Sequence, residues 1–349
     1  MTLMNGVEPY FSTNLGGAYL GDSLNLLTKL SDNSVDLICT SPPFALLRKK
    51  AYGNVHSSDY VEWFMRFAKE FRRILKPKGS LVVDIGGTWT KGYPVRSLYH
   101  FELVIQLCKP VENEGGGFSL AQELYWYNPA KLPTPAEWVT VRRERVKDAV
   151  NTVWWLSLDA HPKASNRRVL KPYSNAQLKL MKNGYKPKTR PSEHVISSKF
   201  GKDNKGSIPP NMIDGLEEMG EEIGSPTVVP VNVISASNTS SNDQYLRLCR
   251  AHGIKPHPAR FPKALPEFVI GLCTEENDLV LDPFAGSNMT GYMAQSMGRR
   301  WISFELNEKY LQGATFRFVE DIPISGSNGE EKANGDKFRP AMQSKLEGF

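Results

Sequence analysis

The sequence predicts a doubly wound α/β fold, in which helices cover both faces of a mostly parallel sheet. Short apolar strands alternate with helical stretches toward both ends of the chain, at about 24–85 and 265–318. Helix–turn–strand units of this size are typical of a parallel sheet. The 349 residues are 40% hydrophobic and 23% charged, which supplies a core and excludes both a stapled miniprotein and a disordered chain.

The first part of the chain predicts a short helix at 24–30, then a strand at 35–40 that must end where two prolines leave the hydrogen-bonding ladder. Behind Asp59, apolar residues recur at helical spacing and predict a helix from 60 to 75. The next strand is 80–85, which two glycines terminate.

The last third of the chain repeats this rhythm. Proline, glycine and asparagine separate the apolar stretches, so each stretch is expected to be one element. The predicted elements are a helix at 265–272, a strand at 278–281, a helix at 290–297, a strand at 301–305 and a helix at 307–318.

Residues 116–249 differ in composition and predict an inserted module. The net charge of the chain is +6, yet 160–210 carries twelve Lys and Arg against two acids. A localised basic block is typical of a protein that binds a polyanion such as nucleic acid, and a solvated basic loop is the alternative. The stretch 212–222 has five acids and no base, and 324–349 predicts a flexible tail.

Several classes of protein are excluded by what the sequence lacks. It has no apolar stretch of the roughly 20 residues that a membrane helix needs, and no basic segment followed by an apolar one at its start. Its four cysteines form no Cys-x-x-Cys pair and its six histidines have no metal-ligand spacing. We therefore expect a cytoplasmic protein with reduced thiols, no metal and no membrane contact.

One candidate binding motif spans two of the predicted strands. Asp282 to Asn288 form a glycine-containing loop after a strand, and Glu305 ends the next strand 19 residues after Gly286. A carboxylate about 20 residues beyond such a loop suits the ribose hydroxyls of a nucleotide-type ligand. The loop has neither Gly-x-Gly-x-x-Gly nor Gly-Lys-Ser/Thr, so a nucleoside cofactor without a phosphate chain is favoured. An ordinary turn followed by a surface acid is the alternative.

A second motif, Thr40 to Phe44, also follows a strand. Two prolines stiffen this loop and fix the direction of its carbonyl groups, while Phe44 offers a stacking face. Such an edge suits a planar amine, because hydrogen bonds to Ser41 and to the Pro42 carbonyl would draw the nitrogen toward tetrahedral geometry. The alternative is a stiff turn beside a core phenylalanine.

Together, Ser-Pro-Pro-Phe at 41–44 and Asp-Pro-Phe-Ala-Gly-Ser at 282–287 resemble the S-adenosylmethionine-dependent amino methyltransferases of DNA. Because the Pro-Pro motif precedes the cofactor loop, the sequence resembles the permuted beta group of these enzymes and is similar to the PvuII-type N4-cytosine methyltransferases. The resemblance covers roughly residues 10–320. Other segments that carry it are 46–54, 146–155, 189–192, 206–211, 257–262 and 301–305.

The resemblance implies a Rossmann-like methyltransferase sheet in permuted strand order, with an inserted target-recognition module. The implied divisions are a catalytic half at 1–115, a target-recognition and DNA-binding module at 116–249, a cofactor-binding half at 250–323 and a tail at 324–349.

The implied cofactor is S-adenosylmethionine. By resemblance, the 282–288 loop cradles its methionine end, Glu305 takes the ribose, and Asp22 takes the adenine amine, while the segment 257–262 lines the methionine side. The full implied cofactor set is Asp22, Arg260, Phe261, Pro262, Asp282, Pro283, Phe284, Ala285, Gly286, Ser287, Asn288, Thr290 and Glu305.

The implied catalytic residues are Ser41, Pro42, Pro43, Phe44 and Asp84. Asp84 would complete a proton relay through Ser41, or else accept hydrogen bonds from the amides of the glycine loop that follows it. The DNA-binding candidates, of which His194 is equally well explained as a surface-loop residue, are Arg48, Lys49, Lys50, Arg142, Arg143, Lys188, Arg190, His194 and Lys205.

The resemblance implies methyl transfer to the N4 amine of a cytosine flipped out of double-stranded DNA. It also implies a restriction–modification system, whose endonuclease need not be a physical partner, and a prokaryotic, nucleoid-associated location. The alternatives are an N6-adenine methyltransferase, a non-catalytic DNA-binding protein on the same scaffold, and an enzyme acting on RNA or protein. C5-cytosine chemistry is disfavoured because the sequence has no Pro-Cys.

Overall fold

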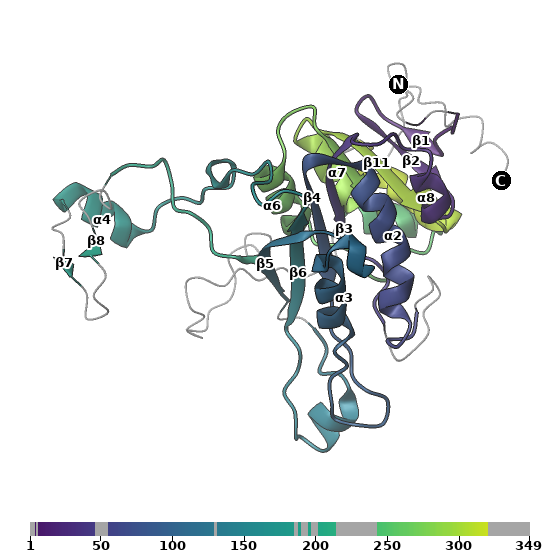
Figure 1. Ribbon diagram of the computed structural model, residues 1–349, viewed down its shortest axis with the longest axis horizontal. Helices are drawn as coiled ribbons and strands as arrows, with labels where there is room; N and C mark the ends of the chain where they lie inside the picture. The colour runs from purple at the N-terminus through teal and green to yellow at the C-terminus, as the bar shows by residue number, and fades with distance from the viewer. Residues whose placement is uncertain are drawn as a thin grey trace, which may run out of the picture.

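The computed structural model describes residues 4, 6–45, 55–128, 131–184, 188–189, 195–196, 202–213 and 243–319, with only the backbone described at 188–189 and 195–196. A nine-stranded sheet with the order β1-β2-β11-β10-β3-β4-β6-β5-β9 lies at its centre (Figure 1). Helices cover both faces of this sheet, which confirms the predicted doubly wound α/β class.

The sheet strands and the helices have the following bounds. The main-sheet strands are β1 (Phe11–Ser12), β2 (Gly16–Leu20), β3 (Val35–Thr40), β4 (Leu75–Ile85), β5 (Ser119–Tyr127), β6 (Val150–Ser157), β9 (Met212–Ile213), β10 (Leu279–Asp282) and β11 (Arg300–Glu305). A separate pair joins β7 (Lys188–Thr189) and β8 (Val195–Ile196). The α-helices are α1 (Ser23–Leu27), α2 (Tyr60–Ile74), α3 (Tyr99–Cys108), α4 (Asn175–Asn183), α5 (Gln244–Ala251), α6 (Ala264–Cys273), α7 (Met289–Ser296) and α8 (Glu308–Ala314).

Two apolar layers hold the helices on the sheet. Buried side chains of α1, α2 and α3 form one layer, and those of α6, α7 and α8 form the other. Phe64, Phe67 and Phe71 recur along one face of α2, as the predicted helical spacing requires. Burying a phenylalanine of this kind contributes roughly 1.5–3 kcal/mol. All six residues of β3 are buried, because both of its faces are covered.

The strand order reverses between β10 and β3. The chain passes from β10 through α7 to β11 on one side, and from β3 through α2 to β4 on the other, and all four strands are parallel. Ligands of doubly wound sheets bind outside the carboxyl ends of the strands at such a switch point. Here Thr40 ends β3 and Asp282 ends β10, so the two predicted motifs meet at one edge.

The β4 strand begins earlier than predicted. It starts at Leu75, and its pairing with β3 shifts register between Val35 and Leu37. This irregularity accommodates Pro77, which has no backbone N–H to donate to a ladder. The strand predicted at 35–40 and the helix predicted behind Asp59 are confirmed at Val35–Thr40 and Tyr60–Ile74.

Three strands, β5, β6 and β9, lie inside the range predicted as an inserted module but belong to the main sheet. β6 pairs antiparallel with β4, and β5 pairs with β6. Parts of the range 116–249 therefore belong to the main sheet. The role of the module in target recognition and the other predicted divisions stay predictions, and 324–349 lies outside the described residues.

Beyond β6 the chain forms an arm that projects away from the sheet and carries α4, none of whose residues is buried (Figure 1). The base of this arm is fixed to the sheet domain. Lys163 Nζ lies 2.6 Å from Asp278 Oδ2, and Arg168 Nε donates to the Gly271 carbonyl at 2.9 Å. Two of the twelve bases in the predicted block are thus paired within the fold.

Among the residues that the structure describes, no helix is long and apolar enough to cross a membrane. Within the same residues, no group of three or more His, Cys, Asp and Glu side chains is arranged to hold a metal ion. All four cysteines are free thiols.

Candidate active site

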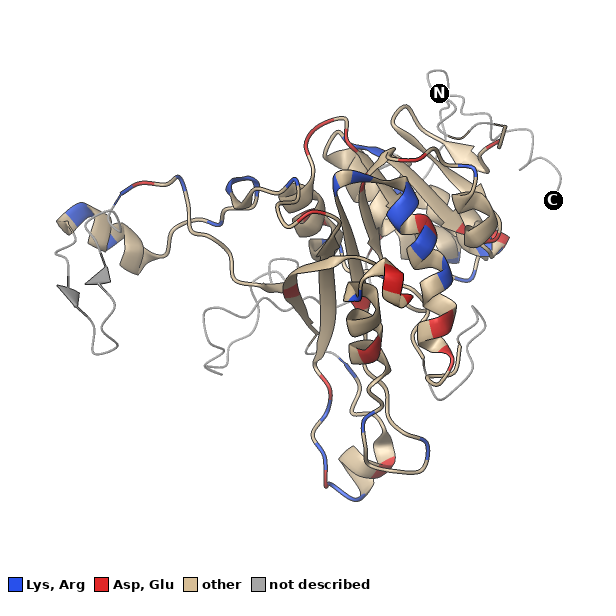
Figure 2. Cartoon of the chain, in the orientation of Figure 1, with Lys and Arg blue, Asp and Glu red and all other residues tan. Residues whose placement is uncertain are grey.

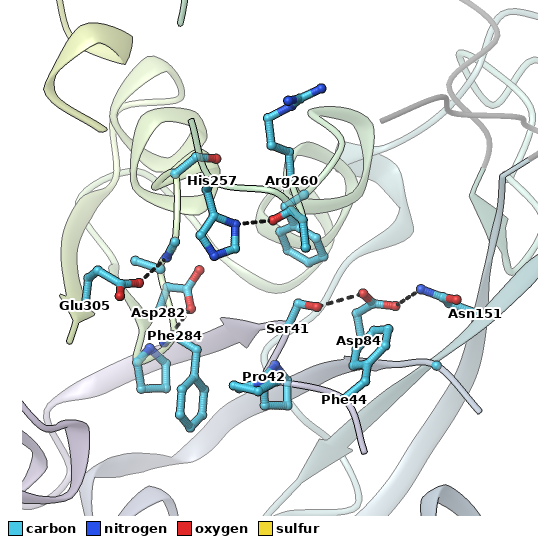
Figure 3. Close-up of a pocket in the computed structure, with 18 of the residues that line it drawn as sticks. Ser41, Pro42, Phe44, Asp84, Asn151, His257, Arg260, Asp282, Phe284 and Glu305 are labelled. Carbon is cyan, nitrogen blue, oxygen red and sulfur yellow. Dashed lines mark hydrogen bonds between the residues drawn. The ribbon is translucent and has the colours of Figure 1, made fainter. Parts of the chain in front are cut away.

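A cavity of about 610 Å³ opens at the carboxyl edge of β3, β4, β10 and β11. All five predicted catalytic residues line it, and so do most of the predicted cofactor residues (Figure 3). The cofactor candidates that line it are Asp22, Arg260, Phe261, Asp282, Pro283, Phe284, Ala285, Gly286, Ser287 and Glu305. The three that do not are Pro262, Asn288 and Thr290.

Asp282 is the anchor of the cofactor side. Its carboxylate accepts hydrogen bonds from the Thr40 hydroxyl and the Thr290 hydroxyl, each at 2.7 Å, and from the Phe284 amide at 3.1 Å. Burial raises the pKa of this carboxyl to about 6, although the three donors act in the opposite direction. Thr290 therefore does not line the cavity, but its hydrogen bond holds the Asp282 carboxylate in place.

The loop after β10 is held in place by Glu305. One carboxylate oxygen accepts from the Gly286 amide at 2.9 Å and the other from the Asn307 amide at 2.8 Å. Gly286 has φ +53°, and an added Cβ would meet the His257 ring at 3.2 Å, so glycine suits this position. Burial raises the pKa of Glu305. Asn288, also at positive φ, caps α7 by accepting from the Gly291 amide.

The segment 257–262 forms another wall. His257 Nδ1 lies 2.5 Å from the Ala259 carbonyl, and its ring meets Tyr310 edge-on at 4.5 Å. Burial lowers the pKa of His257, so its imidazole is neutral at physiological pH. On the opposite side, Asp22 caps α1 by accepting from the Asn25 amide at 3.2 Å while lining the cavity.

The Ser-Pro-Pro-Phe side of the cavity is built around Asp84. Ser41 Oγ donates to Asp84 Oδ2 at 3.0 Å, and Asn151 Nδ2 donates to Asp84 Oδ1 at 3.1 Å (Figure 3). Burial raises the pKa of Asp84 to about 6, while both hydrogen bonds and the charge of Lys131 oppose this change. The alternative partner suggested for Asp84, the amides of the following glycine loop, is not among its observed bonds.

Close packing fixes the aromatic walls. An added Cβ on Gly86 would meet the Phe44 ring at 2.7 Å, so glycine lets this ring lie against the end of β4. Trp63 of α2 also lines the cavity, with its ring centroid 5.8 Å from that of Phe284. The cavity thus combines apolar walls with carboxylates.

Sequence reasoning missed several residues of the cavity. Asn151 and Trp126 come from β6 and β5, and Lys131 from the loop between them. No local pattern marks these residues, because their position depends on the antiparallel register of β6 against β4, in which Asp84 pairs with Val153. The hydrophobic spacing of α2 predicted its buried face but not that Trp63 would reach the cavity.

None of the described DNA-binding candidates lines the cavity. Arg142 lies 3.1 Å from Glu137 and over the Trp138 ring, in the loop that projects between β5 and β6. Arg143 and Lys205 both have positive φ. Lys205 lies in the arm, along which Figure 2 shows several Lys and Arg residues. Only the backbone of Lys188 is described. The candidates outside the described residues are Arg48, Lys49, Lys50, Arg190 and His194.

The buried Asp282 carboxyl makes the free energy of unfolding depend on pH. Its pKa of about 6, against 3.8 when unfolded, means that the native protein retains a proton that the unfolded chain loses between about pH 4 and 6. Stability from this group is therefore lost as pH rises through that window, by up to about 3 kcal/mol.

We predict that Asp282→Asn, which cannot titrate, gains stability relative to the wild type between pH 4 and pH 8 by up to about 3 kcal/mol. Urea unfolding at the two pH values measures this double difference. The exposed Asp59 supplies the control, Asp59→Asn, which should leave the pH dependence unchanged. An equal stability difference at both pH values would contradict a pKa near 6 for Asp282.

The comparisons with known proteins agree with this geometry. A family model for N6/N4 methyltransferases, described as DNA methylase, matches residues 35–316. The type II methyltransferase M.PvuII of Proteus hauseri is 48% identical over 319 residues, covering 90% of this chain and 87% of that protein. The type II methyltransferase M.BamHI of Bacillus amyloliquefaciens is 26% identical, covering 93% of this chain and 63% of that protein.

A solved structure has the same architecture. The PvuII DNA methyltransferase, described as cytosine-N4-specific, superposes with a TM-score of 0.68 at 43% identity, over 92% of each chain. The match of the family model covers most of the chain, including both motifs at the edge of the sheet. The predicted resemblance is therefore confirmed, and the chain belongs to the N6/N4 DNA methylase family of S-adenosylmethionine-dependent methyltransferases.

Proposed function

We propose that this enzyme transfers a methyl group from S-adenosylmethionine to the N4 amine of a cytosine that is flipped out of duplex DNA. The observation that carries the proposal is the hydrogen-bonded pair of Ser41 and Asp84, which shares one cavity with Asp282 and Glu305. The similarity to M.PvuII supports cytosine N4 as the target and a type II restriction–modification system as the setting.

The charge of the cavity suits S-adenosylmethionine. Its lining includes five carboxyl groups, at Asp22, Asp84, Asp148, Asp282 and Glu305, against the two bases Lys131 and Arg260. This ligand has a positive sulfonium and ammonium and one carboxylate, and so a net charge of +1. An acidic cavity with few bases favours it and disfavours a polyphosphate nucleotide.

The residues that would hold it follow from their donors and acceptors. Glu305 offers acceptor lone pairs to ribose hydroxyls, Asp22 offers them to an adenine amine, and Asp282 faces the methionine end. Arg260 and Phe261 close the cavity from the segment 257–262. When bound, S-adenosylmethionine supplies a methyl group on a sulfur that leaves as a neutral thioether.

The Ser-Pro-Pro-Phe loop prepares the amine. A cytosine amine is a poor nucleophile because its lone pair is delocalised into the ring. Ser41 Oγ and the Pro42 carbonyl accept its two N–H hydrogens and draw the nitrogen toward tetrahedral geometry, while Phe44 stacks on the ring. N4 then bonds to the methyl carbon as the carbon–sulfur bond breaks, and the displaced N4 proton passes toward Ser41 and Asp84. Alignment of the reacting atoms and stabilisation of charge on nitrogen supply the rate enhancement.

The rival products differ in what they require. N6-adenine methylation uses the same amine chemistry, and identity to an N4-specific relative favours cytosine. C5 methylation needs a cysteine nucleophile, yet Cys39 beside the motif is fully buried, and burial raises its pKa well above the usual value. Base flipping is required because N4 is not accessible for attack within a stacked duplex.

The two projections beside the cavity supply the DNA contacts. The loop between β5 and β6 carries Arg142 and Arg143, and the arm carries Lys205. These side chains bind phosphates and position the duplex, and a subset contacts base edges. The enzyme then works on chromosomal DNA in a prokaryotic cytoplasm, beside a cognate endonuclease that it need not bind.

The product identifies the reaction. We predict that the purified protein, incubated with S-adenosylmethionine and unmethylated duplex DNA, yields N4-methylcytosine when the DNA is digested to nucleosides and analysed by mass spectrometry. N6-methyladenine would overturn the choice of base and leave the mechanism. Methylation of RNA or protein in parallel incubations, with none of DNA, would overturn the substrate class. Sequencing of the methylated DNA then gives the recognition sequence.

Ser41→Ala removes one of the two acceptors for the amine and the link to Asp84. We predict that the methylation rate constant falls by about 10²–10³-fold, as for loss of an oxyanion-hole donor, while affinity for duplex DNA stays within twofold. Single-turnover kinetics and fluorescence anisotropy measure the two quantities. Ser12→Ala, at an exposed site on β1, is the matched control. Near-normal turnover of Ser41→Ala would remove Ser41 from the mechanism.

Phosphate contacts should make binding depend on salt. We predict that the logarithm of the dissociation constant rises linearly with the logarithm of salt concentration, and that Arg143→Met and Lys205→Met each lower the slope by about 1. Lys69→Met, on the exposed side of α2, should leave the slope unchanged. A salt-independent affinity, or unchanged slopes in both Arg143→Met and Lys205→Met, would contradict this assignment.

A further inference from the structure

A third and a fourth residue extend the hydrogen bonds of Ser41 and Asp84 away from the cavity. Asn151, near the start of β6, is 3% exposed and donates to Asp84 Oδ1 at 3.1 Å. Lys131 reaches Asn151 from the loop after β5. Its ammonium donates to Asn151 Oδ1 and also to the Val150 carbonyl at 3.3 Å. Four side chains thus form one line from Lys131 to Ser41.

The chemistry of Lys131 and Asp84 fixes the direction of every bond in this line. An ammonium group can only donate, so the amide atom that it contacts must be the oxygen of Asn151. The amide nitrogen then faces Asp84, and an ionised carboxylate can only accept. The Ser41 hydroxyl must therefore give its single hydrogen to Asp84. Only lone pairs of Ser41 Oγ remain for a ligand in the cavity.

We propose that Lys131, acting through Asn151, is a positioning residue that makes Ser41 an obligate hydrogen-bond acceptor. The inference rests on the proposed function and concerns the choice of base. A ligand group facing Ser41 must then donate, as the exocyclic amine of cytosine does. The carbonyl oxygen at the same ring position of uracil or thymine can only accept, and it would face the Ser41 lone pairs without a hydrogen between them.

Among the side chains that the structure describes, Lys131 supplies the positive charge that lowers the pKa of Asp84. The other titratable groups that interact with Asp84 are Cys39 on β3, Tyr60 on α2 and Tyr99 on α3, and burial raises the pKa of each, so all three are neutral near pH 7. Burial lowers the pKa of Lys131 and Arg96 acts in the same direction, while the charges of Asp84 and Asp148 oppose this change. Loss of the Lys131 charge should favour the protonated form of Asp84.

The first test is the pH dependence of the single-turnover rate constant. For Lys131→Met we expect a loss of about tenfold or more at pH 7, with partial recovery toward pH 8.5, because protonation of Asp84 now persists to higher pH. Lys131→Arg keeps a donor-only cation and should keep the wild-type profile, as should the control Lys69→Met. A lysine with a merely structural role would lower the rate equally at every pH, and that result would overturn the inference.

The second test compares bases within one variant, so that partial misfolding cancels. Duplexes carry the identified recognition sequence with the target position opposite an abasic site, and the target is either cytosine or uracil. We expect wild type and Lys131→Arg to bind the cytosine duplex about tenfold more tightly or better, the scale of one mismatched hydrogen-bonding group. In Lys131→Met and Asn151→Leu this preference should fall clearly below that of the wild type and Lys131→Arg, while the Pro42 carbonyl, which can only accept, retains part of it. An unchanged preference would overturn the inference.

The outcomes separate this inference from the proposed function. If the wild type methylates no cytosine in any duplex, the proposed function fails. If the wild type makes N4-methylcytosine while the Lys131 variants retain both the wild-type pH profile and the preference for cytosine over uracil, only the role of Lys131 fails.

Discussion

The burial of two carboxylates at one edge of a parallel sheet is the constraint on which the rest of the site depends. Asp84 and Asp282 are 1% and 4% exposed, and burial raises the pKa of each to about 6. A buried charge is costly unless hydrogen bonds compensate it. Hydroxyl and amide donors from neighbouring strands and loops supply that compensation, and most of the residues that supply them are also the walls of the cavity.

The same compensation joins segments that are far apart along the chain. The hydrogen bond from Thr40 to Asp282 spans 242 residues and ties the two parallel strands at which the sheet order reverses. The Ser-Pro-Pro-Phe motif and the loop after β10, which lie far apart in the sequence, therefore meet at one edge of the sheet. This explains how a permuted chain retains one methyltransferase site, with donor and acceptor in a single cavity.

Local patterns predicted several elements around these carboxylates. The helix behind Asp59, the strand before Ser41 and the acid that ends β11 follow from apolar spacing, proline and glycine alone. The cavity residues that β5 and β6 contribute could not be predicted in this way, because Asn151 reaches Asp84 only through the antiparallel register of β6 with β4. The same strands were predicted within the inserted module, since their tryptophans and flanking bases hid a sheet pattern. The net charge of the basic block overestimates the number of basic side chains available to bind DNA, because Lys163 and Arg168 form ion pairs with acids of the sheet domain.

The central claim is that these carboxylates are buried yet ionise near neutral pH, and direct titration tests it. Protein labelled with ¹³C at the aspartate carboxyl carbon would be followed by NMR from pH 4 to 8, with Asp84→Asn and Asp282→Asn spectra to assign the two resonances. The structure predicts that both titrate near pH 6 in the free enzyme. Titration of both groups near 4, the value of an exposed aspartate, would contradict the account.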